Sequence, residues 1–235
     1  MHTGKGHVLE LVLQDGHRHV RVSCQSTLIP APGQYLLAND ESDTPLPVPL
    51  FYTDSAAQGF MAVAPASVSW NPGHGLSLRG PLGHGFSLPL AARRVGLVAF
   101  DDQPARLRGL IQPALRQDAD IVLVCSAAPD SLPDDVEVQP LSALDEIVNW
   151  ADYIAFDVER ANVHQLRQQL ATRNHRSGMS AEVLIRTPLP CGGIAECGVC
   201  AVSARSDWKL ACKDGPVFDW SELDSSFLVE QRREI

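Results

Sequence analysis

Apolar and polar residues alternate in short runs over residues 7–90. Residues 7–13 and 19–23 show this pattern, and the pair Asp15-Gly16 separates them as a turn would. Further turn-forming groups occur at Pro32-Gly33, Pro72-Gly73 and Gly83-His84-Gly85. Short strands joined by such turns are typical of all-β folds. We therefore expect residues 1–92 to form an antiparallel β-barrel.

From Arg94 the pattern changes to continuous apolar runs separated by segments with helical periodicity. The apolar runs, which we expect to be buried strands, are 95–100, 121–125, 136–138, 153–156 and 182–186. The helical segments between them are 104–117, 142–150 and 162–172. Strands that alternate with helices predict a mostly parallel, doubly wound sheet. We assign residues 93–187 to such a Rossmann-like domain.

The remaining residues, 188–235, are rich in Gly, Cys and Pro and show no sustained periodicity. This composition predicts a small domain built from loops rather than from long helices or strands. The charged residues after Trp220 are typical of a solvated C-terminal tail.

Four of the six cysteines crowd into this last segment, with the spacing C-x5-C-x2-C-x11-C. They are Cys191, Cys197, Cys200 and Cys212. Plant-type [2Fe-2S] sites use C-x4-C-x2-C with a distant fourth cysteine, so the first gap here is one residue longer. Glycines between the cysteines would let backbone amides approach the sulfides. The spacing predicts four thiolate ligands of a [2Fe-2S] cluster.

Two alternatives stay open for these cysteines. Four thiolates also suit a tetrahedral zinc ion, although zinc sites usually pair two short C-x2-C units and only Cys197 and Cys200 form one here. The thiols could also be unligated. Cys24 and Cys125 lie alone in the sequence, and we expect them to be inert core residues.

Three segments carry a resemblance to a known family. They are the cysteine loop with Leu210-Ala-Cys-Lys-Asp-Gly-Pro-Val-Phe218, the turn Gly80-Pro-Leu-Gly-His-Gly-Phe86, and Pro32-Gly-Gln-Tyr35. In these the chain resembles the electron-transfer subunit of two-component dihydroorotate dehydrogenases, a branch of the ferredoxin reductase superfamily. The resemblance implies an FAD-binding barrel, an NAD-binding Rossmann-like domain and a [2Fe-2S] domain. It also implies a hetero-oligomer with a flavoenzyme catalytic subunit.

The flavin site of that family is reproduced only in part. Relatives carry Arg-x-Tyr-Ser/Thr on one strand, and the matching stretch here is Leu50-Phe51-Tyr52-Thr53, without the arginine. Loss of a phosphate-binding arginine removes charge-assisted bonds of roughly 1.5 to 3 kcal/mol each, which weakens FAD binding without excluding it. The FAD contacts implied by the resemblance are Tyr52, Thr53, Gly80, Pro81, Leu82 and Gly83. The alternative is that these residues are barrel core and a tight turn.

The nicotinamide site looks lost. A dinucleotide pyrophosphate binds where a Gly-rich turn follows the first strand of a doubly wound sheet, whereas this chain has Asp101 and Asp102 there. After a later strand, where relatives carry Cys-Gly-Pro, this chain has Asp157 and Glu159. Carboxylates repel phosphate, so we expect NAD not to be used. We interpret these four acidic residues as solvated capping groups.

Composition narrows the function classes further. The chain has 235 residues and a formal net charge of -9, which disfavours binding to the nucleic-acid backbone. It shows neither a signal-peptide pattern nor an apolar run of roughly 20 residues, so we expect a cytoplasmic protein without a membrane span. No hydrolase or phosphate-loop motif occurs, and we assign no catalytic residue.

The sequence thus predicts a relay subunit that passes electrons between a flavoenzyme partner and another redox protein. A fully competent NADH-dependent reductase is the first alternative, and a non-enzymatic interaction protein with structural zinc is the second.

Overall fold

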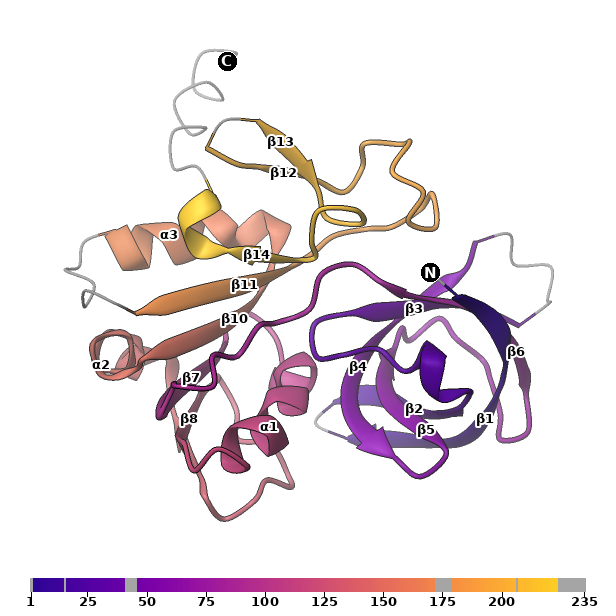
Figure 1. Cartoon of the computed structure of the whole chain (residues 1–235), viewed down its shortest axis with the longest axis horizontal. Helices are drawn as coiled ribbons and strands as arrows, with labels where there is room; N and C mark the ends of the chain where they lie inside the picture. The colour runs from indigo at the N-terminus through magenta and orange to yellow at the C-terminus, as the bar shows by residue number, and fades with distance from the viewer. Residues whose placement is uncertain (1, 15, 41–45, 172–178, 206, 224–235) are drawn as a thin grey trace.

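The computed structural model describes residues 2–14, 16–40, 46–171, 179–205 and 207–223, and they form three packed parts (Figure 1). A closed β-barrel lies beside a six-stranded sheet with helices, and a small C-terminal segment lies against both. The predicted combination of barrel, Rossmann-like sheet and C-terminal cysteine segment is confirmed. No helix in the described part of the chain is long and apolar enough to cross a membrane.

The barrel has six antiparallel strands that close in the order β1-β2-β5-β4-β3-β6. Their bounds are β1 His2–Gln14, β2 His17–Ser23, β3 Tyr35–Asn39, β4 Val48–Ala56, β5 Gly59–Ala64 and β6 Gly75–Leu82. Alternate residues point inward, so Val20 and Val22 of β2 meet Leu50 of β4 and Phe60 of β5 in the core. The 3-10 turn η1 (Ser26–Leu28) adds Leu28, which is fully buried there.

The sheet follows the order β14-β11-β10-β7-β8-β9. Its parallel strands are β7 Arg94–Ala99, β8 Asp120–Val124, β9 Val136–Gln139, β10 Tyr153–Glu159 and β11 Ser180–Arg186. The chain winds outward from β7 to β9 and then returns to β10 and β11 on the other side of β7. The carboxyl ends of β7 and β10 therefore meet at the switch point, where doubly wound sheets bind their ligands.

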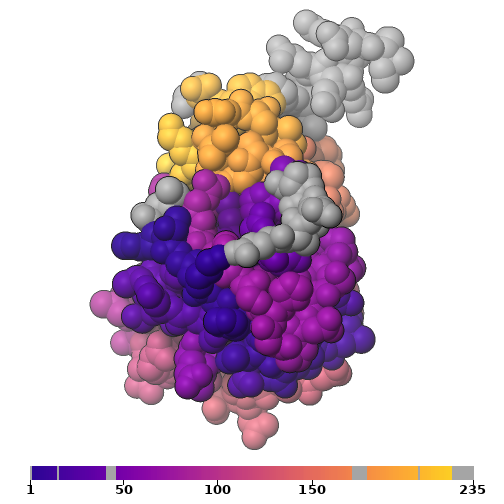
Figure 2. Space-filling model, turned by 90° about the vertical axis from the view of Figure 1, so that its right-hand side faces the viewer, coloured from indigo at the N-terminus to yellow at the C-terminus, as the bar shows by residue number. Residues whose placement is uncertain are grey.

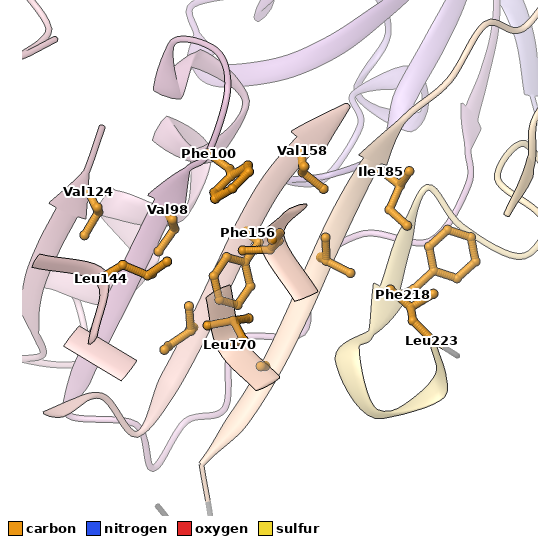
Figure 3. Close-up of a cluster of buried hydrophobic side chains, with 14 of the residues drawn as sticks. Val98, Phe100, Val124, Leu144, Phe156, Val158, Leu170, Ile185, Phe218 and Leu223 are labelled. Carbon is orange, nitrogen blue, oxygen red and sulfur yellow. The ribbon is translucent and has the colours of Figure 1, made fainter. Parts of the chain in front are cut away.

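Helices cover both faces of the sheet. One face packs against η2 (Pro104–Leu110) and α1 (Ile111–Leu115), which replace the single helix expected at 104–117. The other face packs against α2 (Leu144–Trp150) and α3 (Val163–Ala171), which follow the short turns η3 (Leu141–Ala143) and η4 (Arg160–Asn162). Figure 3 shows Phe156 and Val158 of β10 on this second face, together with Leu144 and Leu170 of the helices.

The C-terminal segment is less irregular than expected. Strands β12 (Ala201–Ser203) and β13 (Trp208–Leu210) form a hairpin, and η5 (Trp220–Glu222) follows β14 (Val217–Asp219). Strand β14 pairs antiparallel with β11, so this segment extends the sheet of the preceding part. Phe218 and Leu223 lie beside Ile185 in the shared core (Figure 3).

The expectation of a purely loop-built segment was wrong because Val217 and Phe218 bury apolar side chains that only the sheet can cover. Most of the expected tail, from residue 224 onward, lies outside the described residues. The predicted domain boundaries at 92/93 and 187/188 fall in the connections before β7 and after β11, and they stay predictions.

Candidate metal centre and interdomain pocket

The four cysteines lie on loops at the junction of the three parts. Cys200 and Cys212 are buried, Cys191 is half-buried and Cys197 is exposed. In Figure 2 this C-terminal segment, in orange and yellow, sits directly on the indigo and purple barrel. Cys197 therefore lies at the solvent-exposed edge of the cysteine group, whereas Cys200 and Cys212 are covered by protein.

The thiols are arranged in two pairs. The Cys197 thiol hydrogen-bonds to Cys191, and the Cys200 thiol hydrogen-bonds to Cys212. No group of three or more His, Cys, Asp or Glu residues, among those that the structure describes, is gathered so that it could hold a single metal ion. Two pairs of thiolates match the way in which a two-iron cluster divides four cysteines between its irons.

Backbone amides are turned toward these sulfurs. Burial opposes ionisation of Cys191, but the Cys197 thiol and the amides of Ile194, Glu196 and Cys197 lower its pKa to about 6. Positive φ angles of 61° at Gly192 and 74° at Gly193 curl the loop and so bring these amides around the sulfur. This is the amide cradle that the glycine spacing predicted, and it favours a thiolate.

Cys212 has the opposite environment. Burial raises its pKa, and the neighbouring Cys200 sulfur raises it further. A metal must therefore displace the proton from this buried thiol when it binds, as thiolate ligands require. The donor set of four cysteines, one of them already favoured as thiolate, fits an iron-sulfur cluster.

The barrel supports the cysteine loop directly. Tyr35 is fully buried, and its hydroxyl donates a hydrogen bond of 3.5 Å to the carbonyl of Cys212. Arg79 donates a hydrogen bond from Nη2 to the carbonyl of Gly192. Burial and the negative charge of the nearby cysteine sulfurs raise the pKa of Tyr35, which places its hydroxyl within electrostatic range of the ligands.

A second feature is a cavity of about 630 Å³ between the barrel and the carboxyl end of the sheet. It lies beside the ring of Phe51 on β4 and beside the cations Arg18, Arg106 and Arg186. The guanidinium of Arg106 lies 5.8 Å from the Phe51 ring centroid, a cation-π distance. The size falls within the roughly 300–1,000 Å³ common for sites of small molecules and cofactors.

Phe51 also connects this cavity to the cysteine group. Its ring centroid lies 5.3 Å from that of Tyr35, whose hydroxyl contacts the Cys212 carbonyl. Sequence reasoning missed Phe51 because the family pattern aligns Tyr52 with the flavin-facing tyrosine. The alternation of strand residues was the available signal, since the buried Leu50 places Phe51 on the outer face.

The predicted flavin contacts lie elsewhere. Tyr52 stacks on Phe60, with ring centroids 6.3 Å apart, and Thr53 is buried; neither lines the cavity. Gly80, Pro81 and Leu82 form the end of strand β6 instead, and Gly83 follows them against the cysteine segment. A Cβ on Gly83 would approach the Cδ of Pro216 to 2.4 Å, so this turn fits closely against the C-terminal segment.

A network of charged residues occupies the carboxyl ends of β7 and β10. Asp157 is fully buried and pairs with Arg106 at 3.3 Å and Arg186 at 2.8 Å. Asp102 pairs with the same two arginines, at 3.1 and 3.4 Å, and Asp101 pairs with Arg186. We call these five residues the aspartate-arginine network. Arg106 and Arg186, which the sequence analysis did not single out, neutralise the carboxylates.

The interpretation of these acidic residues as solvated caps was wrong for Asp157, which is fully buried, and for Asp102, which is half-buried and paired with two arginines. The cap position of η2 is Gln103, and no side chain caps it. Burial would raise the pKa of Asp102, but the Gln103 amide and the neighbouring cations lower it. Asp101 and Glu159 are exposed, as expected. The physical reason is that Arg186, at the end of β11, points across β10 toward the carboxylates.

The network also joins the sheet to the barrel. His17, at the start of β2, lies with its Nε2 atom 3.0 Å from Oδ1 of Asp102. Asp101 accepts hydrogen bonds from the Glu159 amide at 2.9 Å and from the Asn162 side chain at 2.7 Å. The place where a dinucleotide pyrophosphate would meet bare amides is therefore filled by paired side chains.

Comparison with known proteins agrees with this description. Residues 191–224 match the model of the iron-sulfur cluster binding domain of dihydroorotate dehydrogenase B, and all four cysteines lie within the match. Among curated proteins, no significant match is found. The cysteine segment is thus an iron-sulfur cluster-binding domain.

The fold is shared with solved reductases. One similar structure is that of an NADH-dependent reduced ferredoxin-NADP oxidoreductase, described for flavin-based electron bifurcation. It is 16% identical with a TM-score of 0.74, and the match covers 98% of this chain and 93% of that one. A ferredoxin reductase of carbazole 1,9a-dioxygenase is 15% identical with a TM-score of 0.60, covering 78% and 68%. A ferredoxin-NADP+ reductase from Plasmodium falciparum is 9% identical with a TM-score of 0.56, covering 74% and 91%.

At these identities the likeness concerns the fold. Together with the iron-sulfur domain, it confirms the predicted resemblance to the electron-transfer subunit of dihydroorotate dehydrogenase B and supports a role in electron transfer.

Proposed function

We propose that this chain is a relay subunit that passes electrons through a [2Fe-2S] cluster, and through FAD, to or from a flavoenzyme resembling dihydroorotate dehydrogenase. It does so without oxidising NADH itself. The observation that carries the proposal is the group of four thiols, which lies in two pairs beneath an amide cradle. No residue of the chain takes a catalytic role in this proposal, because the bound cofactors supply the redox chemistry.

Each cysteine has a role in holding the cluster. Cys191 and Cys197 would hold one iron, and Cys200 and Cys212 the other, since each pair is already in contact. The buried pair packs into the core of the sheet, whereas Cys197 is exposed. Cluster ligation by thiolates requires all four to be deprotonated, and the cradle around Cys191 favours that state.

The interdomain cavity supports the FAD part of the proposal. The Phe51 ring offers a flat face for an aromatic isoalloxazine, and Arg18 offers a cation for phosphate. In this proposal Arg18 binds the FAD phosphate in place of the family's arginine, whose position is taken by Leu50 here. The roles of Tyr52, Thr53 and Gly80–Gly83 in flavin binding stay predictions, since these residues do not line the cavity.

The aspartate-arginine network supports the independence from NADH. A pyrophosphate at the switch point would need unpaired amides or cations, but Arg106 and Arg186 already pair with carboxylates. A dinucleotide would have to break these buried pairs, which costs about 3–5 kcal/mol for each partner removed. Any electron donor or acceptor on this side is therefore proposed to be another redox protein rather than a nicotinamide.

The partner flavoenzyme is proposed to dock on the exposed edge of the cysteine loop. Ile194 and Val199 keep 51% and 42% of their surface exposed, and they flank the exposed Cys197. Exposed apolar side chains beside a redox group are typical of interaction sites. A hetero-oligomer, a cytoplasmic location and the absence of nucleic-acid binding belong to the same proposal.

One anaerobic preparation tests these claims. The purified protein is analysed for iron, sulfide, zinc and released flavin, and its visible spectrum is recorded before and after NADH and then dithionite. Two irons and two sulfides per chain, with bleaching by dithionite and no response to NADH, are the expected results. Flavin released in amounts equal to the chain would establish that the protein binds FAD.

Other outcomes would overturn the proposal in distinguishable ways. Rapid bleaching by NADH would mean that the network opens for a nicotinamide, and the chain would then be an NADH-dependent reductase. Colourless protein with one zinc per chain would mean a structural zinc site and an interaction protein without electron transfer. A [2Fe-2S] spectrum without flavin would restrict the relay to the cluster.

A further inference from the structure

Arg79 is a barrel residue that holds the start of the cysteine loop. It lies on β6, opposite Leu37 of β3 and Thr3 of β1, and is half-buried. Its Nη2 atom donates a hydrogen bond to the carbonyl of Gly192, the residue that follows Cys191. The contact crosses from the barrel to the cluster-binding segment, 113 residues away in the sequence.

The loop lies so close to the barrel here that little space is left between them. A Cβ on Gly192 would lie 3.2 Å from Cγ of Pro47 and 3.4 Å from Nη2 of Arg79. A Cβ on Gly193 would lie 3.1 Å from the Tyr35 hydroxyl oxygen. The backbone beside Cys191 is therefore fixed by barrel side chains rather than by the loop alone.

The surroundings of the Arg79 cation differ from those of Arg106 and Arg186, which are also partly buried. Arg106 and Arg186 face carboxylates at 3.4 Å or less, whereas no ion pair between described residues includes Arg79. Arg79 and the sulfurs of Cys191, Cys200 and Cys212 all act electrostatically on Tyr35. Together with its contact to Gly192, this shows that the cation lies beside the cysteine group.

We propose that Arg79 is a positioning residue that fixes the backbone beside Cys191 and raises the reduction potential of the cluster. This inference rests on the proposed [2Fe-2S] site. Reduction of the cluster adds one electron to one of its irons, with no bond made or broken, and so increases its negative charge. A fixed cation in partly buried surroundings stabilises the reduced form more than the oxidised form, and charge and hydrogen bonds near the cluster set its potential.

The test is a reductive titration of the holoprotein, followed by the absorbance and the electron paramagnetic resonance of the cluster. In R79Q a side-chain amide can still donate to the Gly192 carbonyl, but the charge is gone. We expect the equilibrium to shift toward the oxidised cluster by roughly tenfold, which is about 59 mV more negative for one electron. In R79K the charge is kept, so most of the potential should return.

R21Q is the matched control, because it removes one cation from the same barrel. Arg21 lies on β2, two strands away from β6 in the closed order, and pairs with Glu10 at 3.3 Å. Its potential should equal that of the wild type. Equal potentials in R79Q and R21Q would refute the inference, as would an R79K potential as low as that of R79Q.

Two failures are kept apart by this design. If the wild-type protein itself holds no [2Fe-2S] cluster, the proposed function fails before any variant is compared. If R79Q binds too little cluster to titrate, R79K decides: a potential and an iron content near those of the wild type support the role of the charge. Low iron content in R79K as well, with R21Q normal, would refute the inference about potential and leave Arg79 as a structural hydrogen-bond donor.

Discussion

The buried Asp157 offers the sharpest test of the aspartate-arginine network. Its side chain is fully buried and makes ion pairs to Arg106 at 3.3 Å and to Arg186 at 2.8 Å. D157N keeps the shape of the side chain but removes its charge. Both arginines then keep Asp102, at 3.1 and 3.4 Å, so neither is left without a carboxylate.

The expected loss follows from these contacts. Removing one partner of a buried pair costs about 3–5 kcal/mol, and the lower end applies because Asp102 remains and asparagine can still accept one hydrogen bond. We expect D157N to lower the free energy of unfolding by about 3 kcal/mol. With a urea slope of about 2–3 kcal/mol per molar, the unfolding midpoint should fall by about 1–1.5 M.

D152N is the matched control, because Asp152 lies just before the other end of the same strand, β10. Asp152 pairs with Arg94 at 2.5 Å, but 32% and 30% of their side-chain surfaces are exposed to solvent. Exposed pairs of this kind contribute about 0.2–1 kcal/mol. Urea unfolding of both variants, followed by tryptophan fluorescence, compares them directly. If D157N lost no more stability than D152N, the network would not be the buried structural element described here.

Four further outcomes are expected. C197S should lose the visible spectrum of the cluster and about half of its iron or more, whereas C125A, which changes a buried cysteine outside the loop, should keep both, as iron analysis would show. G83A should weaken the packing of the cysteine segment, because its Cβ would approach Cδ of Pro216 to 2.4 Å and its φ is 75°. We expect a loss of about 2 kcal/mol in urea unfolding, and no loss would contradict the reasoning. F51L should raise the dissociation constant of FAD between about twofold and tenfold in fluorescence titrations, since one aromatic contact is lost. The pKa of Asp102 is lowered in the folded protein, so its contribution to stability is present above the ordinary carboxyl pKa and is lost as the pH falls through the lower folded value. The difference in unfolding free energy between wild type and D102N should therefore shrink from about pH 5 toward pH 2. A difference that stays constant over this range would argue against this role of Asp102.

Periodicity predicted the order of the strands and helices well. The expected strands at 95–100 and 121–125 correspond to β7 and β8, shifted by one residue, because both are buried on two faces and have continuous apolar sequences. The helix expected at 104–117 divides into η2 and α1, since Pro104 and Gly109 lie in its first half. Spacing alone singled out the four cysteines as candidate ligands, because three of them share one short Gly-rich segment.

Contacts between distant segments were beyond the sequence. Arg186 carries no signal of its own, and its pairing with Asp157 depends on the two strands lying side by side. The acidic residues were recognised as incompatible with a phosphate, but not as a buried network. Phe51 was passed over because a one-residue change of register exchanges the two faces of a strand, and the family pattern favoured Tyr52.

The antiparallel strand β14 gives iron loading a consequence for the sheet itself. Cys212 lies five residues before Val217, and the backbone between them leads directly into the pairing of Val217 and Phe218 with β11. A cluster that holds Cys212 therefore also holds β14 on β11, and by mass action its binding energy stabilises the sheet. Without iron, β14 is released more easily, and β11 presents unpaired amides and carbonyls on a strand whose buried residues are Val183, Leu184 and Ile185. Such an uncovered strand can pair with a second chain, so we expect the iron-free protein to aggregate more readily than the iron-loaded protein.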